Sequence, residues 1–487
     1  MHTDILEKLK SALQPQSTVG LYDNASASAK ATADKHSRHQ ILKSDYKRVL
    51  IHNTPFLFTG GADGHLQILK NHSLIISNGL IASVLPATEI KLEGFDLIYD
   101  AGKRGGVIIT PGLINTHAHS HMYLMRSAMM LDEGEGVDET IAAMGRWARY
   151  ETDDSYALAA AGDLTEQQKS GITTTLAHGP SFEALETAAK LTNQNVINAV
   201  SAISNSRPTN TPEAAEKYLS QNNWQSVPAI SIHYLYKASL ETLKKIRSLS
   251  ERYNTLVTFH MAESPRVAQD AKKIHGSSEV ELLAATGLLN EHSLAAHVIY
   301  VNDEEIAKLV ENHVGIAHLP TSNVIHKSGT FPFWKFEDAG GFPYLSLGTD
   351  SVVSKSRLDI LSEAYQTRLT HLFDRTVKFS SLFKMMTVNG ARVLHAKDRG
   401  RIAPGFKADL AFWKLKDRGT IPYDEANPIT LLGNLITHGG RFVRDLMING
   451  QFVIKDRRHA LVDESRLLSR LQQEHMAMRQ RIQSASS

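Results

Sequence analysis

Eight short apolar runs recur between residues 107 and 396, at intervals of thirty-odd residues. They are rich in β-branched residues and bounded by turn residues, which is typical of buried parallel strands. In order, the runs read VIITPGLINTHAH, GITTTLAH, VINAVSAIS, PAISIHYLY, TLVTFHMAE, SLAAHVIYV, VGIAHLP and YLSLGTDS. The segments between them carry helix-start signals, such as Pro212 after Thr211 and Glu305 three residues after Asn302. This alternation predicts an α/β fold with a parallel sheet.

Eight repeats of this unit favour a closed (β/α)8 TIM barrel, which typically takes about 250 residues. The alternative is a doubly wound open sheet, but neither a GxGxxG nor a Walker A loop follows any of the runs. We place the barrel at residues 109–399. Segments 46–108 and 400–460 instead hold short alternating runs split by turn residues, and MINGQFVI has the Asn-Gly pair typical of a hairpin. We expect these two segments to form one small β-sandwich domain that flanks the barrel.

The two ends of the chain differ from this pattern. Residues 1–45 have the character of an N-terminal extension, with a short amphipathic helix over Met1–Leu13. The stretch Gln14–Ser44 is polar and poor in large apolar residues, so we expect it to be loosely held. Residues 461–487 have apolar side chains at helical spacing and predict a C-terminal helical tail. That tail either docks on its own domain or forms a dimer contact, and the sequence leaves both open.

The composition excludes several kinds of chemistry. The chain has no cysteine and 23 histidines, so any metal site must use His and carboxylate ligands. The formal net charge of +2 is close to neutral, so it does not indicate a surface that binds nucleic acid or an anionic membrane. No apolar run reaches membrane length, and the acids near the N-terminus are untypical of secretory or transit signals. We therefore expect a cytoplasmic protein with a small-molecule substrate, and neither a nucleic-acid nor a membrane partner.

Histidine or aspartate stands near the end of seven of the eight apolar runs. In a parallel barrel the carboxyl ends of all strands meet on one face, and that face carries the active site. The residues are His117, His119, His178, His233, His260, His297, His318 and Asp350. The sequence from the first to the last of them divides into seven units of about 33 residues, in keeping with the size of such a barrel. Positions far apart in the sequence are thus predicted to form one cluster.

Four of these positions, together with the nearby Glu263, have the spacing of a metal site. His117 and His119 stand at i and i+2 of a strand, so both imidazoles point the same way. His260 and Glu263 form an H-x-x-E after the fifth run, and Asp350 follows the eighth. Taken alone, each could be a surface or helix-capping residue. Together, three histidines, an aspartate and a water suit Zn²⁺ or another borderline divalent ion, which would acidify that water to a pKa near 7.

The motifs PGLINTHAH, HMAES, AAHVIYVNDEE, IAHLPTSN and LSLGTDS occur in this order and resemble the amidohydrolase superfamily. The branch they most resemble holds cytosine and guanine deaminases, S-adenosylhomocysteine deaminases and triazine hydrolases. The similarity covers about residues 46–455 and includes the flanking segment GRIAPGFKADLAFW. No single motif is specific to this superfamily, but the combination of motifs in this order is. The resemblance supports the predicted barrel with its small β-sandwich.

The resemblance implies a mononuclear metal site. The metal ligands that it implies are His117, His119, His260 and Asp350. Glu263 matches the proton shuttle, and His297 matches the histidine that orients the attacking hydroxide or the developing tetrahedral centre. The implied catalytic residues are thus Glu263, His297 and Asp350. The implied cofactor is one divalent ion per subunit, with zinc as the first choice and iron as the alternative.

The substrate contacts are less defined. His233 matches a position that often touches substrate, whereas His178 has no ligand role by this match and is either a substrate contact or structural. Arg126 either faces an acidic substrate group or forms a salt bridge at the barrel mouth. The loops after the seventh and eighth runs, which include His326 and residues 351–357, depart from many relatives. These loops shape the pocket, so they leave the identity of the substrate open.

Three functions fit these observations. The first is a metal-dependent aminohydrolase, in which metal-activated hydroxide attacks an amidine-like carbon, such as one in a nitrogen heterocycle, and ammonia leaves. The second keeps the site but expels chloride, alkylamine or thiolate from a triazine, or opens a formimino or amidine group. The third is a non-catalytic scaffold. The complete ligand set favours an enzyme, and Glu263 favours an amino leaving group because such a group must be protonated. The resemblance also implies a homo-oligomer, with a dimer as the expected form.

Overall fold

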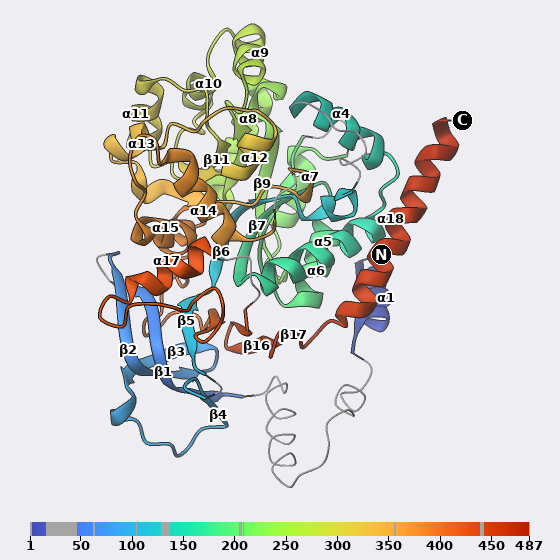
Figure 1. Cartoon of the computed structure of the whole chain (residues 1–487). Coiled ribbons are helices and arrows are strands. Elements are labelled where there is room, and N and C mark those ends of the chain that lie inside the picture. The colour runs from blue at the N-terminus through green and yellow to red at the C-terminus, as the bar shows by residue number, and fades with distance from the viewer. Residues whose placement is uncertain are drawn as a thin grey trace.

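The structure is a computed structural model that describes residues 2–15, 46–61, 64–103, 105–127, 137–203, 207, 209–354, 357–438 and 443–486. Eight parallel strands follow one another in sequence order around its centre (Figure 1). They are β6 (Leu113–Ala118), β7 (Ile172–Gly179), β8 (Asn195–Ser201), β9 (Val227–Tyr234), β10 (Val257–Met261), β11 (Ser293–His297), β12 (Gly315–His318) and β13 (Leu345–Leu347). The predicted parallel α/β fold is confirmed, and each strand comes from one of the eight apolar runs.

The first and last of these strands meet and close the sheet into a barrel. A parallel bridge joins Ala118 to Asp350, just beyond β13. The carbonyl oxygen of His117 accepts hydrogen bonds from the backbone N–H groups of Thr349 (3.1 Å) and Asp350 (3.0 Å). The Thr116 hydroxyl donates to the Leu347 carbonyl oxygen at 2.9 Å. This seam places the last residue of the histidine and aspartate series beside the first.

Helices alternate with the strands and cover the barrel. They are α4 (Val137–Ala148), α5 (Asp153–Lys169), α6 (Phe182–Thr192), α7 (Pro212–Leu219), α8 (Leu240–Tyr253), α9 (Pro265–His275), α10 (Glu279–Thr286), α11 (Asp303–Glu311), α12 (Pro320–Ile325), α13 (Phe333–Asp338), α14 (Ile360–His371), α15 (Phe379–Met386), α16 (Val388–Val393) and α17 (Ile429–Thr437). Short 3-10 turns are η1 (Ala87–Glu89), η2 (Ser120–Met125), η3 (Leu235–Lys237), η4 (Phe342–Tyr344) and η5 (Val352–Ser354). Both predicted helix starts are present: Thr211 caps α7 with Pro212 in its first turn, and Asn302 and Glu305 form a capping box on α11.

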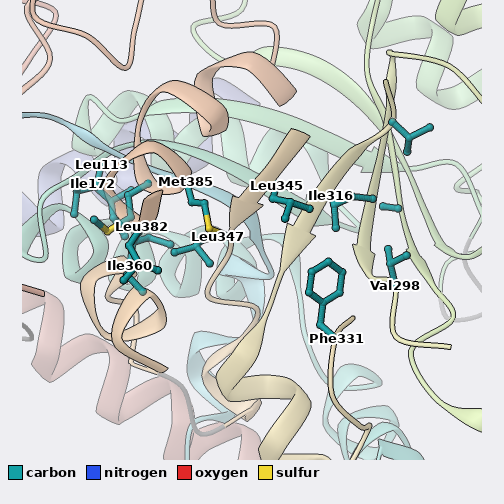
Figure 2. Close-up of a cluster of buried hydrophobic side chains, with 14 of the residues drawn as sticks. Leu113, Ile172, Val298, Ile316, Phe331, Leu345, Leu347, Ile360, Leu382 and Met385 are labelled. Atoms are coloured by element: carbon teal, nitrogen blue, oxygen red, sulfur yellow. The ribbon is translucent and has the colours of Figure 1, made fainter. Parts of the chain in front are cut away.

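The main hydrophobic core lies between the barrel strands and the surrounding helices. Figure 2 shows part of it, where Leu347 of β13 lies near Ile360 of α14 and Leu382 of α15, and Ile316 extends the cluster on the neighbouring strand β12. All four side chains are almost completely buried. Burying each aliphatic side chain of this size contributes about 1.5–3 kcal/mol. This packing fixes the strand ends that carry the polar residues.

The segments that flank the barrel in the sequence join in one separate sheet of nine strands. It contains β1 (Arg48–Gly60), β2 (Leu66–Ser77), β3 (Leu80–Pro86), β4 (Leu97–Asp100), β5 (Val107–Pro111), β14 (Leu410–Lys414), β15 (Asp445–Ile448), β16 (Gln451–Lys455) and β17 (Arg458–His459). Strand β14 pairs antiparallel with β5, so the two halves are continuous. A core of its own unites both halves, with Leu57 and Ile76 from the first and Phe412 and Met447 from the second. The domain limits expected from the sequence stay predictions.

The predicted Asn-Gly hairpin is confirmed between β15 and β16. Ile448 pairs with Gln451, and the two turn residues between them have positive φ angles, 50° at Asn449 and 80° at Gly450. A two-residue turn with both φ angles positive matches the twist of an antiparallel pair, and Asn and Gly adopt that conformation at low cost.

The N-terminal and C-terminal helices lie against the barrel next to each other (Figure 1). Helix α1 (His2–Leu13) and helix α18 (Glu464–Ser486) both contact α5, and α18 also contacts η2 and α4. Leu467, Leu471 and Met478 of α18 are buried there, so the tail docks on its own chain. The loosely held stretch expected at Gln14–Ser44 falls almost wholly on residues 16–45, which lie outside the described residues. Among the helices that the structure describes, none has the length and apolar character needed to cross a membrane.

Candidate active site

Three histidines meet at the carboxyl end of the barrel. His117 and His119 come from the end of β6, and His260 comes from β10 on the opposite part of the sheet. The Nε2 atom of His119 lies 3.2 Å from Nε2 of His117 and 3.2 Å from Nε2 of His260. All three side chains are buried. Within the described part of the chain, these are the residues whose ligand atoms come close enough together to hold a metal ion.

The geometry of this cluster fits a small divalent ion. Metal–nitrogen bonds of about 2.0–2.1 Å in a tetrahedral site place neighbouring nitrogens about 3.3 Å apart, close to the two distances of 3.2 Å between Nε2 of His119 and its neighbours. The Nδ1 atom of His260 lies 2.6 Å from the carbonyl oxygen of His233, so Nδ1 carries the proton and Nε2 offers its lone pair. Burial lowers the pKa of His117 and His260, and it lowers the pKa of His119 to about 3. The three imidazoles are therefore neutral at physiological pH, as metal ligation requires.

Asp350 stands beside this cluster. Its Oδ1 atom lies 3.5 Å from Nε2 of His119 and 3.9 Å from Nε2 of His117. Its Oδ2 atom accepts hydrogen bonds from the hydroxyls of Ser322 (2.6 Å) and Ser354 (3.0 Å), so Oδ1 is turned toward the histidines. Burial acts to raise the pKa of Asp350, but electrostatic interaction with the neighbouring imidazoles and the hydrogen bond from the Ser322 hydroxyl outweigh it, and the net pKa is lowered. Asp350 is thus an anion that can complete the set of three nitrogens.

Glu263 and His297 form a second pair on the same face. The Oε1 atom of Glu263 lies 3.6 Å from Nε2 of His297. The Nδ1 atom of His297 lies 2.8 Å from the Asn323 side-chain oxygen, to which it donates. The hydroxyl of Tyr234 donates to Glu263 Oε2 at 2.6 Å. Burial and the negative charge of Glu263 raise the pKa of Tyr234 well above its usual range, so this phenol keeps its proton.

A cavity opens onto both groups. Its polar and titratable lining residues are His119, His233, Tyr234, His260, Glu263, His297, His326, Asp350, Ser351 and Ser354. Other parts of the wall come from outside the barrel strands: Met122 from η2, Thr140 and Met144 from α4, and Val353 from η5. A wall that combines these polar groups with apolar side chains suits a heterocycle that carries a reactive polar edge.

The three predicted substrate contacts lie in different surroundings. His233 lines the cavity, and its ring centroid lies 4.7 Å from that of His260. His178 is buried against the cluster, with its ring 4.6 Å from that of His117 and its Nε2 3.1 Å from the Thr258 hydroxyl oxygen, but it is not part of the cavity wall. Arg126 forms an ion pair with Glu166 at 2.7 Å, as the salt-bridge alternative expects, and it is not part of the cavity wall either.

Sequence reasoning missed several residues that hold the site together. Ser322 and Ser354 fix Asp350, and Tyr234 fixes Glu263. A serine or tyrosine hydroxyl carries no signal of this kind in one sequence, because the chain has many such side chains and they are indistinguishable without the fold. Met122 and Met144 were also missed, since their part in the cavity depends on how η2 and α4 lie over the barrel mouth.

Comparison with known proteins agrees with this geometry. The model of the amidohydrolase family matches residues 108–453. The 5-methylthioadenosine/S-adenosylhomocysteine deaminase of Pyrococcus furiosus is 30% identical over 413 residues, which is 82% of this chain and 94% of that protein. The 5'-deoxyadenosine deaminase of Methanocaldococcus jannaschii is 27% identical over 426 residues, which is 84% of this chain and 97% of that protein.

Solved structures share the fold. A triazine hydrolase from Arthrobacter aurescens superposes with a TM-score of 0.79 at 20% identity, covering 89% of this chain and 99% of that one. An adenosine deaminase from Xanthomonas campestris with bound zinc has a TM-score of 0.78 at 22% identity, covering 90% of this chain and 98% of that one. The predicted family and enzyme class are thereby confirmed. The chain belongs to the amidohydrolase family and is a hydrolase of carbon–nitrogen bonds, with a His117, His119 and His260 cluster suited to a metal ion.

Proposed function

We propose that this protein is a zinc-dependent aminohydrolase that removes the amino group of an adenine nucleoside modified at its 5' carbon. The observation that carries the proposal is the shared cavity: two imidazoles of the three-histidine cluster, those of His119 and His260, line the same cavity as Asp350 and Glu263. The names of the two deaminase relatives support the substrate class, because both describe adenosines with an altered 5' position. A purine presents an amino group on an amidine-like carbon, which is the bond type that this set of residues is equipped to hydrolyse.

We assign one ion per subunit to His117, His119, His260 and Asp350. A divalent ion bound there would acidify water and so supply a nucleophile near neutral pH. Zinc is the first choice, because nitrogen and carboxylate ligands in a tetrahedral arrangement suit it and because the Xanthomonas relative holds zinc. Iron stays the alternative.

The residues around the cluster divide the proton transfers between them. Asp350 and His297 orient the attacking water, and Glu263 accepts its proton. Glu263 then passes that proton to the ring nitrogen next to the reacting carbon. The second proton of the water, carried by the newly bound oxygen, moves to the amino group, which leaves as ammonia. The carbon–nitrogen bond breaks, a carbon–oxygen bond takes its place, and the net reaction consumes one water. His233, on the cavity wall, is assigned to binding the heterocycle.

Ammonia release from the zinc-loaded protein tests this proposal. The panel contains 5'-deoxyadenosine, 5'-methylthioadenosine, S-adenosylhomocysteine and adenosine, with cytosine, guanine, a pterin and chloro- and alkylamino-triazines as competitors. Ammonia from the 5'-modified adenosines at the highest kcat/KM supports the proposal. Release of chloride or an alkylamine from a triazine, without ammonia from any purine, would replace it with the triazine alternative.

Two further expectations stay predictions. The resemblance implies a homodimer, which analytical ultracentrifugation of the purified protein would test. The cytoplasmic location expected from the sequence is tested by fractionation of the source cells.

A further inference from the structure

Tyr234 stands at the end of β9, where its side chain reaches the proposed proton shuttle. Its hydroxyl donates to Oε2 of Glu263 at 2.6 Å, and only 2% of Tyr234 and 3% of Glu263 is exposed. Both residues line the cavity. A short hydrogen bond to a charged group in a buried place is a strong one, so it restricts the carboxylate to one orientation.

The two oxygens of Glu263 therefore have different surroundings. Oε2 is engaged by Tyr234, whereas Oε1 faces Nε2 of His297 at 3.6 Å. Because Nδ1 of His297 donates to Asn323, Nε2 of His297 presents a lone pair toward Oε1. Because Oε1 of Glu263 and Nε2 of His297 are both hydrogen-bond acceptors, a group that donates protons, such as water, is favoured between them. Oε1 is thus the oxygen placed to receive a proton and to release it.

We propose that Tyr234 is a positioning residue for the proton shuttle: its hydroxyl locks the Glu263 carboxylate and leaves Oε1 as the oxygen that carries the proton. This inference rests on the proposed function, in which Glu263 moves a proton from water to the substrate. A glutamate side chain otherwise has several rotamers, and a displacement of about 1 Å in a reacting group can cost about 100-fold in rate.

The backbone under Glu263 is held separately. Ala262, which precedes it, has a positive φ of 48°, and its N–H donates to Oε2 of the buried Glu279 at 2.6 Å. The ring of Tyr234 also packs on its own account, with its centroid 5.5 Å from those of Tyr236 and His260. Substituting Tyr234 with Phe keeps the ring and this backbone support. It removes only the hydroxyl that restrains the carboxylate.

The test compares Tyr234→Phe, Glu263→Gln and the double variant in the zinc-loaded protein with the best substrate of the panel. We expect Tyr234→Phe to lower kcat about 10- to 100-fold while KM changes less than about threefold. In the Glu263→Gln background we expect Tyr234→Phe to have no further effect, because the group through which it acts is already lost. Tyr236→Phe is the matched control, since this tyrosine packs beside Tyr234 but is not part of the cavity wall, and it should keep kcat within about twofold.

Three results would overturn the inference. They are an unchanged kcat in Tyr234→Phe, a rise in KM with kcat unchanged, and an equal loss from Tyr234→Phe in the wild-type and Glu263→Gln backgrounds. Bound zinc and the thermal unfolding midpoint are measured for every variant. Rates are normalised to the folded, zinc-containing fraction, so that the kcat values can be compared even if a variant is less stable. A wild-type protein that releases no ammonia contradicts the proposed function itself, whereas an active wild type with a fully active Tyr234→Phe contradicts this inference alone.

Discussion

Replacing Gly348 with alanine should disturb the metal cluster from outside it. Gly348 precedes Thr349 at the seam between β13 and β6. A Cβ atom at this position would lie 2.8 Å from Cβ of His117, 2.9 Å from its carbonyl oxygen and 2.7 Å from Cδ2 of Leu319. Ordinary contact begins at 3.4 Å, so His117 and Gly348 must separate by about 0.6 Å.

That separation should lower both the free energy of unfolding and the affinity for zinc. Overpacking a tight site of this kind costs about 1–3 kcal/mol of the free energy of unfolding. The same displacement moves His117, a proposed metal ligand, by more than the roughly 0.2 Å tolerance of a ligand distance. It also strains the hydrogen bonds from Thr349 and Asp350 to the His117 carbonyl oxygen. We expect zinc affinity to fall about 10- to 100-fold, and the rate at limiting zinc to fall with it.

The assay is zinc content after dialysis against a competing chelator, followed by ammonia release. Gly179→Ala is the matched control, because Gly179 also ends a barrel strand but the nearest atom to an added Cβ would be the Ser181 carbonyl oxygen at 4.0 Å. The control should retain its zinc and its stability. If Gly348→Ala keeps stoichiometric zinc and wild-type kcat under the same dialysis, the steric argument is wrong.

Three other outcomes follow from the structure. Glu263→Gln should lower kcat about 100- to 10,000-fold with zinc still bound, while Glu311→Gln, on an exposed helix end, should not, as ammonia release and metal analysis would show. Burial lowers the pKa of His459 to about 3. The unfolded chain binds that proton near pH 6.5, so stability should fall as the pH drops from about 6.5 toward 3, by about 1.4 kcal/mol per unit for this group. Denaturant titrations of His459→Gln should show a slope flatter by that amount, and an unchanged slope would reject the assignment. Leu471→Ala should cost about 2–5 kcal/mol of unfolding free energy because this α18 side chain is buried, whereas Leu468→Ala, 61% exposed on the same helix, should be nearly neutral.

The barrel and its metal cluster could be predicted from the sequence because their signals are local. A run such as ITTTLA is rich in β-branched residues, and this composition alone predicts a buried strand. His117 and His119 are neighbours at i and i+2, so one strand already places them together. His260 lies 141 residues beyond His119, yet the barrel rule brings it to the same face, and the two Nε2 atoms lie 3.2 Å apart.

The second layer of the site depends on long-range packing and could not be predicted. Ser322 reaches Asp350 across 28 residues, and Tyr234 reaches Glu263 across 29. Serine and tyrosine have many uses, so neither spacing carries a signal without the fold. Arg126 forms an ion pair with Glu166 of α5, a pairing that no sequence motif indicates, and its contact with a substrate stays a prediction. The cavity wall from α4 follows from how that helix lies over the barrel mouth.

We propose that the histidine cluster holds a zinc ion that supports deamination of a purine nucleoside. The decisive experiment is ammonia release from 5'-deoxyadenosine by the protein before and after removal of its metal and after addition of one equivalent of zinc. We expect stoichiometric ammonia in the first case, none in the second and restored turnover in the third, with His260→Ala inactive throughout. Undiminished turnover by the metal-free protein, or the absence of ammonia from every purine nucleoside at full zinc loading, would contradict it.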